Sequence, residues 1–145
     1  MITNFLKKNK NNSNKEENDD LIKIVALLIH AAKIDEHYSD IEKKIIFDFI
    51  GNFSKKSKEE VSNIITASEE HEKNSNQILE YTKSVKKMDL KLKTLVVKTL
   101  WKIILSDDKS GQYESTLMRR ICGLLYLPDK LSGEIKLKIL EEKKL

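Results

Sequence analysis

The sequence predicts an all-α fold of about seven helices in one compact bundle. The 145 residues include only 4 Gly and 1 Pro, where average usage would give about 10 and 7, so turn-rich β folds and glycine-loop nucleotide sites are disfavoured. Beyond residue 20 the apolar residues recur at helical spacing. With 39% hydrophobic residues, a chain of this length can bury a core as a single domain.

The N-terminal residues 1–20 are predicted to be a flexible polar tail. Residues 7–20 contain no apolar side chain, so nothing there offsets the entropy lost on ordering. The helical domain is therefore expected to span residues 21–145.

The helices follow from their caps and their apolar spacing. The first, over residues 21–34, is apolar nearly all round and is predicted to be central and mostly buried, with His30 on a narrow solvent-facing stripe. It is too short and too often interrupted by charge to span a membrane. Ser39 and Asp89 are expected to be N-caps, and Gly51 is expected to end the second helix. The later helices are predicted over residues 40–50, 57–73, 76–86, 90–105, 112–126 and 129–145.

Two helix–loop–helix units repeat at an offset of 72 residues, which predicts a pseudo-twofold arrangement. Laying residues 21–50 over 93–122 pairs Val25 with Val97, Leu28 with Leu100, Asp35 with Asp107, and Glu42 with Glu114. In the second helix of the first unit, Ile41, Ile45, Ile46 and Phe49 are predicted to form the inward face.

The carboxylates of Glu42 and Glu114 are predicted to point into apolar arcs. Burying an unpaired charge costs several kcal/mol, so each needs a cap, a cation or a raised pKa. In the first interpretation both cap their helices: residues 39–42 read as a capping box, and Glu114 holds the same helical position after Gly111. Asp35 and Asp107 would then accept local backbone hydrogen bonds.

In the second interpretation Asp35, Glu42, Asp107 and Glu114 share a divalent cation. Ca²⁺ or another hard cation such as Mg²⁺ would suit a set of oxygen ligands, and no other cofactor is expected. Neither loop follows the EF-hand pattern, since Asp40 stands where glycine is required and Ile46 where the bidentate glutamate belongs.

The charged residues argue against specific nucleic-acid binding. Net charge is +4, but only Arg119 and Arg120 of the 27 basic residues are arginine, and 23 acidic residues are interspersed with them. Arg120 flanks the apolar arc of the sixth helix, where its guanidinium is predicted to pair with a loop carboxylate.

Catalysis is not expected from this sequence. His30, His37 and His71 lie beside no apparent nucleophile, and the single cysteine, Cys122, falls in an apolar helical run where an inert buried thiol is typical. One cysteine also excludes an intramolecular disulfide, which fits a reducing, cytoplasmic compartment.

The two loop segments, residues 32–42 and 105–114, resemble the paired alanine-aspartate-glycine-glutamate loops of the TerB-like family of tellurite resistance proteins. That family also includes the N-terminal domain of the membrane-anchored DnaJ-like co-chaperone A. The sequence also resembles those of a short bacterial branch of the family, which consists of this domain alone, at residues 100–101, 117–121 and 124–125. The resemblance implies a compact seven-helix fold and an acidic metal-binding patch at Asp35, Glu42, Asp107 and Glu114.

The sequence departs from the family pattern at both loops. Glu36 and Asp108 replace the glycine that follows each aspartate, and His37 and Lys109 replace the next acidic residue. No His-Pro-Asp triplet occurs, so J-domain activity is not expected. We therefore predict a non-enzymatic helical interaction domain that binds a protein partner. The resemblance connects this domain with stress or tellurite resistance. The alternative is a divalent-cation-binding module. It is expected to be a monomer or weak oligomer.

Overall fold

The computed structural model describes residues 18–34, 38–75, 77–107 and 112–143, and these are helical apart from short connections. No strand occurs in the described ranges, so the predicted all-α class is confirmed. A first helix over residues 18–32 precedes six others, and a short 3₁₀ turn, Leu105–Asp107, follows α5. The six are α2 (Asp40–Phe53), α3 (Lys58–Asn74), α4 (Ile78–Lys86), α5 (Leu90–Ile104), α6 (Gln112–Leu124) and α7 (Asp129–Lys143).

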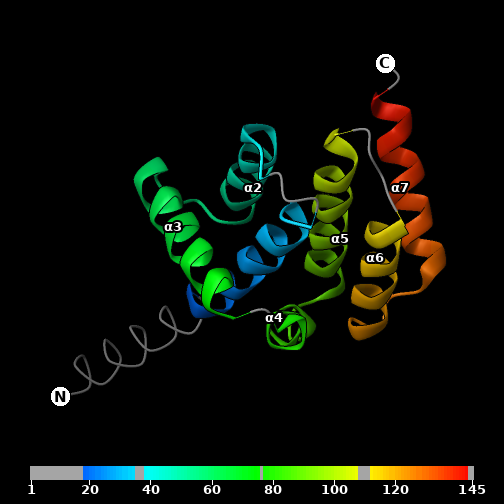
Figure 1. Ribbon diagram of the computed structural model, residues 1–145, viewed down its shortest axis with the longest axis horizontal. Helices are drawn as coiled ribbons and strands as arrows, with labels where there is room; N and C mark the ends of the chain where they lie inside the picture. Colours follow the sequence, from blue (N-terminus) through cyan, green and yellow to red (C-terminus); the bar gives the residue numbers. More distant parts are fainter. Residues whose placement is uncertain (1–17, 35–37, 76, 108–111, 144–145) are drawn as a thin grey trace.

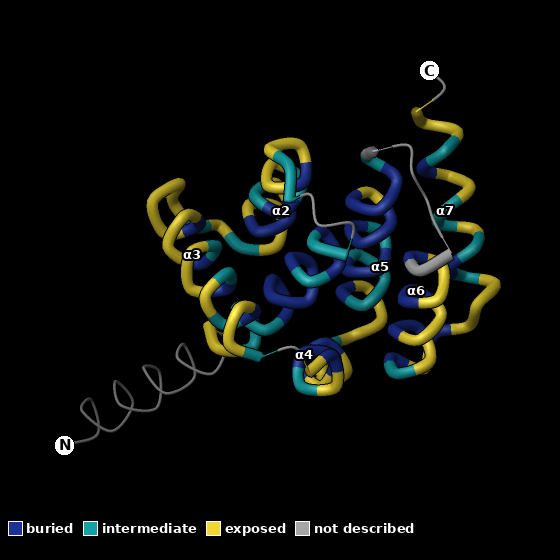
Figure 2. The backbone as a smooth tube through the Cα atoms, viewed as in Figure 1, coloured by how far each residue is buried: buried dark blue, intermediate teal, exposed yellow. Residues whose placement is uncertain are grey.

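The first helix forms the centre of the fold, as predicted. In Figure 1 it is the blue ribbon between α3 on one side and α5 on the other. Its residues 24–29 are almost fully shielded from solvent, which Figure 2 shows as a dark blue segment inside the molecule. Helix α5 is the second organising element, since it contacts α2, α4, α6 and α7.

The first helix begins earlier than the sequence predicted. Residues 18–20 are already helical, and Asp20 Oδ1 lies 3.6 Å from Lys87 Nζ at the connection between α4 and α5. Residues 1–17 of the predicted tail lie outside the described residues, so its flexibility stays a prediction.

The end of α2 also differs from its prediction. The helix continues through Gly51 to Phe53, and it ends at Ser54, whose backbone is extended and whose N–H and hydroxyl both donate to the Ile50 carbonyl. No described glycine has a positive φ, so Gly51 does not take the left-handed conformation of a helix-ending residue. The extra turn carries Phe53 out to the surface beside α5.

The end of α6 takes the left-handed conformation at a residue other than glycine. Tyr126 has φ 57°, and Leu127 N–H donates to the Cys122 carbonyl while Tyr126 N–H donates to that of Gly123. These two bonds form a Schellman motif that closes the helix. Among the described residues, no helix combines the length and apolar character needed to cross a membrane.

Candidate functional site

Glu42 lies in the first turn of α2 with only 3% of its surface exposed. Its Oε1 accepts hydrogen bonds from Ser39 N–H at 2.9 Å and from Ser39 Oγ at 2.8 Å. Glu42 N–H in turn donates to Ser39 Oγ at 3.2 Å. The predicted capping box is therefore confirmed, and a cation at this oxygen would compete with two donors of the protein itself.

Glu114 occupies the first turn of α6 and is 7% exposed, so the predicted burial of both glutamates is confirmed. The residues before α6 that would complete its cap lie outside the described ranges. Asp35 also falls outside them, as does the side chain of Asp107, the last residue of the 3₁₀ turn. Within the described part of the chain, no three His, Cys, Asp or Glu residues are placed to hold a metal ion. A shared site of all four carboxylates stays a prediction.

Arg120 is exposed on the surface of α6, as is Arg119. No described carboxylate forms an ion pair with it. Its predicted partner was a repeat-loop acid, and part of those loops lies beyond the described ranges, so the pairing is still a prediction.

A buried carboxylate that the sequence did not single out joins the first helix to α3. Glu72 is 5% exposed, its Oε2 lies 2.9 Å from Lys33 Nζ, and its Oε1 lies 3.4 Å from His30 Nδ1. The predicted polar stripe at His30 is therefore only partly exposed, because α3 packs against this side of the central helix.

The Tyr38 hydroxyl lies near the same carboxylate. Burial raises the pKa of Tyr38, and the negative charges of Glu69, Glu42 and Glu72 raise it further. The hydroxyl is buried and has no hydrogen-bond partner among the described residues. The cluster of Tyr38, His30 and Glu72 is therefore best understood as a structural junction between the first helix, α2 and α3.

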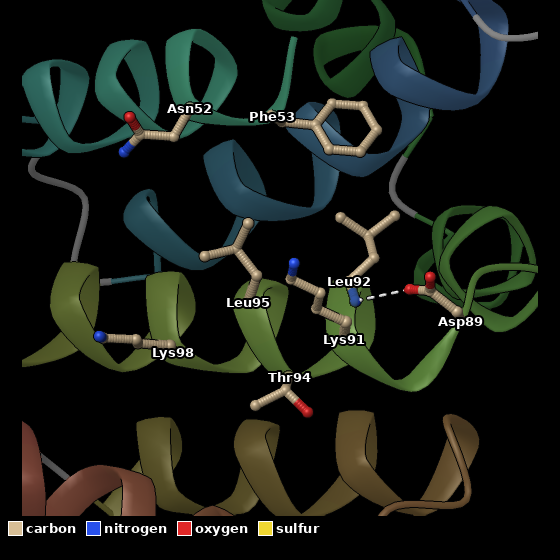
Figure 3. A pocket seen from close by; sticks show the side chains of 8 residues that line it. All are labelled: Asn52, Phe53, Asp89, Lys91, Leu92, Thr94, Leu95 and Lys98. Atoms are coloured by element: carbon tan, nitrogen blue, oxygen red, sulfur yellow. Dashed lines mark hydrogen bonds between the residues drawn. The ribbon is translucent and has the colours of Figure 1, made fainter.

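A groove open to solvent lies between α2 and α5. Near the end of α2 it holds a cavity of about 460 Å³, where Leu92 and Leu95 of α5 extend toward the end of α2 that carries Phe53 (Figure 3). Asn52 and Leu95 also line a neighbouring cavity of about 90 Å³. Ile45 and Lys102 connect that cavity to a third one of about 320 Å³ beside α7. Because neighbouring cavities share lining residues, the three lie in a row along α2 and α5, and we call this row the α2–α5 groove.

Each wall of the α2–α5 groove repeats at the spacing of a single helix face. The two stripes are Ile41, Ile45, Asp48 and Asn52 on α2, and Lys91, Leu95, Lys98 and Lys102 on α5. Their members lie at intervals of four, three and four residues, which places each set on one side of its helix. Ser106, Ile139, Glu142 and Lys143 close the end of the groove beside α7.

The structure corrects the predicted inward face of α2. Ile46, Phe49 and Ile50 are buried, but Ile41 is 62% exposed and Ile45 is only half-buried. The apolar arc of this helix is wider than the surface its neighbours cover, so its edge becomes a wall of the groove.

The polar side chains of the groove are lysines, carboxylates, an amide and hydroxyls. Neither histidine nor cysteine lines any of its three cavities. Cys122 is buried elsewhere, and burial raises the pKa of its thiol. A buried thiol with a raised pKa is a poor nucleophile.

The family described as "Tellurite resistance protein TerB" matches residues 21–137 of the chain. The matched range covers the helical domain from the first helix into α7. No curated protein and no solved structure gives a significant match.

Proposed function

Since the chain belongs to the TerB family of tellurite resistance proteins, we propose that it acts as a non-enzymatic helical interaction domain that binds a protein in the α2–α5 groove. The family match supports the helical domain as the functional unit. The binding surface is inferred from the shape and lining of the groove itself.

The single observation that carries this proposal is the alignment of exposed apolar side chains from two helices along the groove. Isolated exposed apolar residues are normal on any protein surface. Here Ile41, Ile45, Phe53 and Leu95 instead follow one concave path along two helices. Concave surfaces that combine apolar side chains with placed polar groups are typical of binding sites.

The chemistry of the groove favours binding over catalysis. Its polar residues are lysines, carboxylates, amides and hydroxyls, and no base is placed beside a hydroxyl in the manner of an activated nucleophile. The described histidines are engaged elsewhere: His30 lies beside Glu72, and His71 Nε2 lies 3.5 Å from Glu80 Oε1.

The proposal also includes a cytoplasmic location and a monomeric or weakly oligomeric state. The cytoplasmic location follows from the single buried cysteine. A role in stress or tellurite resistance follows from the family alone, and no feature of the groove adds to it. The cation-binding alternative has no observation in its favour among the described residues, and metal titration tests it directly.

Site-specific photo-crosslinking in the native host tests the proposal. A photoreactive amino acid at Asn52, an exposed wall residue, is expected to capture one protein reproducibly. The matched control carries the same group at Lys73, an exposed residue of α3 outside the groove. Equal capture from both positions, or none from Asn52, would contradict the proposed role of the groove.

A further inference from the structure

We propose that the occupant of the α2–α5 groove is an amphipathic helix of a partner protein that presents acidic side chains to α5. This inference rests on the proposed function and adds the conformation and charge of the partner. It follows from the periodicity of the walls and from the distribution of charge along them.

The dimensions of the groove fit a helix of three to four turns. From Lys91 to Lys102 the α5 wall advances 11 residues, which at 1.5 Å per residue is about 16 Å. Apolar side chains of a partner at the same four-, three- and four-residue intervals would meet Leu95 and Ile45 along the floor. This is the arrangement by which amphipathic helices occupy grooves between two helices.

The charge on the α5 wall is not neutralised within the described structure. Lys91, Lys98 and Lys102 gather along this wall, and none of them forms an ion pair with a described carboxylate. The acidic residue that lines this wall, Asp89, caps α5 by accepting from Leu92 N–H at 2.9 Å. Acidic side chains of a partner would complement the charge of these lysines.

The opposite wall makes the expected charge pattern asymmetric. Its only charged lining residue is Asp48 of α2, and Glu142 and Lys143 both lie at the end beside α7. Acidic residues of the partner would be repelled there, so we expect them on the flank that faces α5 and not on both flanks. This asymmetry sets the orientation of the helix about its own axis.

The described part of this chain offers no equivalent helix to a second copy. Its exposed large apolar residues outside the groove are dispersed over separate elements: Leu79 on α4, Leu90 on α5, Tyr126 after α6 and Leu137 on α7. None of these helices presents a stripe of several apolar anchors.

Selection from a displayed library of random peptides of about 16 residues tests the proposal. The full chain is the bait, and each selected peptide is then synthesised and its affinity measured by fluorescence anisotropy. We expect enrichment of helices with an apolar stripe and acidic residues along one flank. Lys98→Glu with Lys102→Glu should weaken these peptides by about tenfold or more, and replacing their acidic residues with lysine should restore binding to that variant.

Matched variants separate the groove from the overall charge of the protein. Lys73→Glu with Lys83→Glu makes the same change in net charge at exposed positions on α3 and α4, and should leave affinity nearly unchanged. Lys91→Gln with Lys102→Gln removes the charge of two exposed residues without reversing it. This variant replaces the glutamate variant in the affinity measurement if the glutamate variant does not fold. Higher salt should weaken the selected peptides, since the contacts are at the rim.

The outcomes distinguish this inference from the proposed function. Groove-binding peptides without acidic residues, insensitive to the Lys98 and Lys102 changes, overturn the inference but leave the groove as a binding site. Failure to enrich any helical peptide also overturns it, and crosslinking from Asn52 then decides whether the groove binds protein at all. Binding to vesicles of anionic lipid, or concentration-dependent self-association that the groove variants abolish, would replace the partner helix with another occupant.

Discussion

Replacing Glu42 separates its role as a helix cap from a role as a cation ligand. Its Oε1 accepts both the backbone N–H and the hydroxyl of Ser39. Glutamine keeps an oxygen that can accept these bonds but removes the negative charge. Alanine removes both, and leaves the Ser39 N–H without this acceptor.

The structure sets the expected size of each effect. A buried donor that loses its acceptor costs about 1–3 kcal/mol, so we expect Glu42→Ala to destabilise the domain by about 2 kcal/mol. In a domain of this size that lowers the Tm by about 6 °C. Glu42→Gln loses charge assistance and the favourable interaction with the helix dipole, together about 1 kcal/mol or less.

Urea unfolding followed by tryptophan fluorescence measures the difference directly. Trp101 is the only tryptophan, is 5% exposed, and its Nε1 donates to Ser132 Oγ at 3.0 Å, so its emission reports loss of the core. The glutamine variant should unfold at a urea concentration between those of wild type and alanine, with unchanged slope. Equal midpoints for the two variants would refute the cap assignment, because they would show that the charge and not the acceptor oxygen contributes the stability.

Three further predictions address the cation alternative, Tyr38 and Arg120. Titrating Ca²⁺, Mg²⁺ or Zn²⁺ to millimolar concentration should leave the Tm unchanged; stabilisation of about 2.7 kcal/mol at 100 times the dissociation constant, lost in Glu42→Gln, would instead establish a cation-binding module. Because the pKa of Tyr38 is raised in the folded state, its contribution to stability is complete below about pH 10 and declines as pH rises further, by up to about 1.4 kcal/mol per pH unit. Urea midpoints between about pH 9 and 11.5 should therefore fall less steeply in Tyr38→Phe than in wild type, and parallel curves would contradict the assigned burial. Arg120 is exposed, so Arg120→Lys should change the free energy of unfolding by less than about 0.5 kcal/mol, and a larger loss measured by urea unfolding would support the predicted ion pair with a loop carboxylate.

The local sequence was sufficient to predict the helices and most of the residues at which they begin. Ser39 with Glu42, Ser57 with Glu60, and Asp89 with Leu92 each form their cap within three residues, so the interaction is complete before any tertiary contact. The helix ends were less predictable. Gly51 permits a stop but does not impose one, and α2 continues until Ser54 closes it.

In the candidate site, too, some features could be predicted from local sequence and others could not. Burial of Glu42 and Glu114 follows from the angular position of each on its own helix, and the structure confirms it. The junction at Glu72 could not be predicted, since Lys33 and Glu72 are 39 residues apart and only the packing of α3 on the first helix brings them together. The exposed edge of α2 was missed because periodicity shows the width of an apolar arc and not how much of it a neighbour covers.

The sequence by itself therefore determined the helical class, the positions of the helices, the capping box at Ser39 and the family. These depend on spacing and on interactions within one turn of helix, which are the same wherever the helix is placed. Tertiary structure alone decided which side chains face each other across helices. The α2–α5 groove exists because α2 and α5 pack through part of their apolar surfaces and leave Ile41, Ile45 and Leu95 beside a row of lysines.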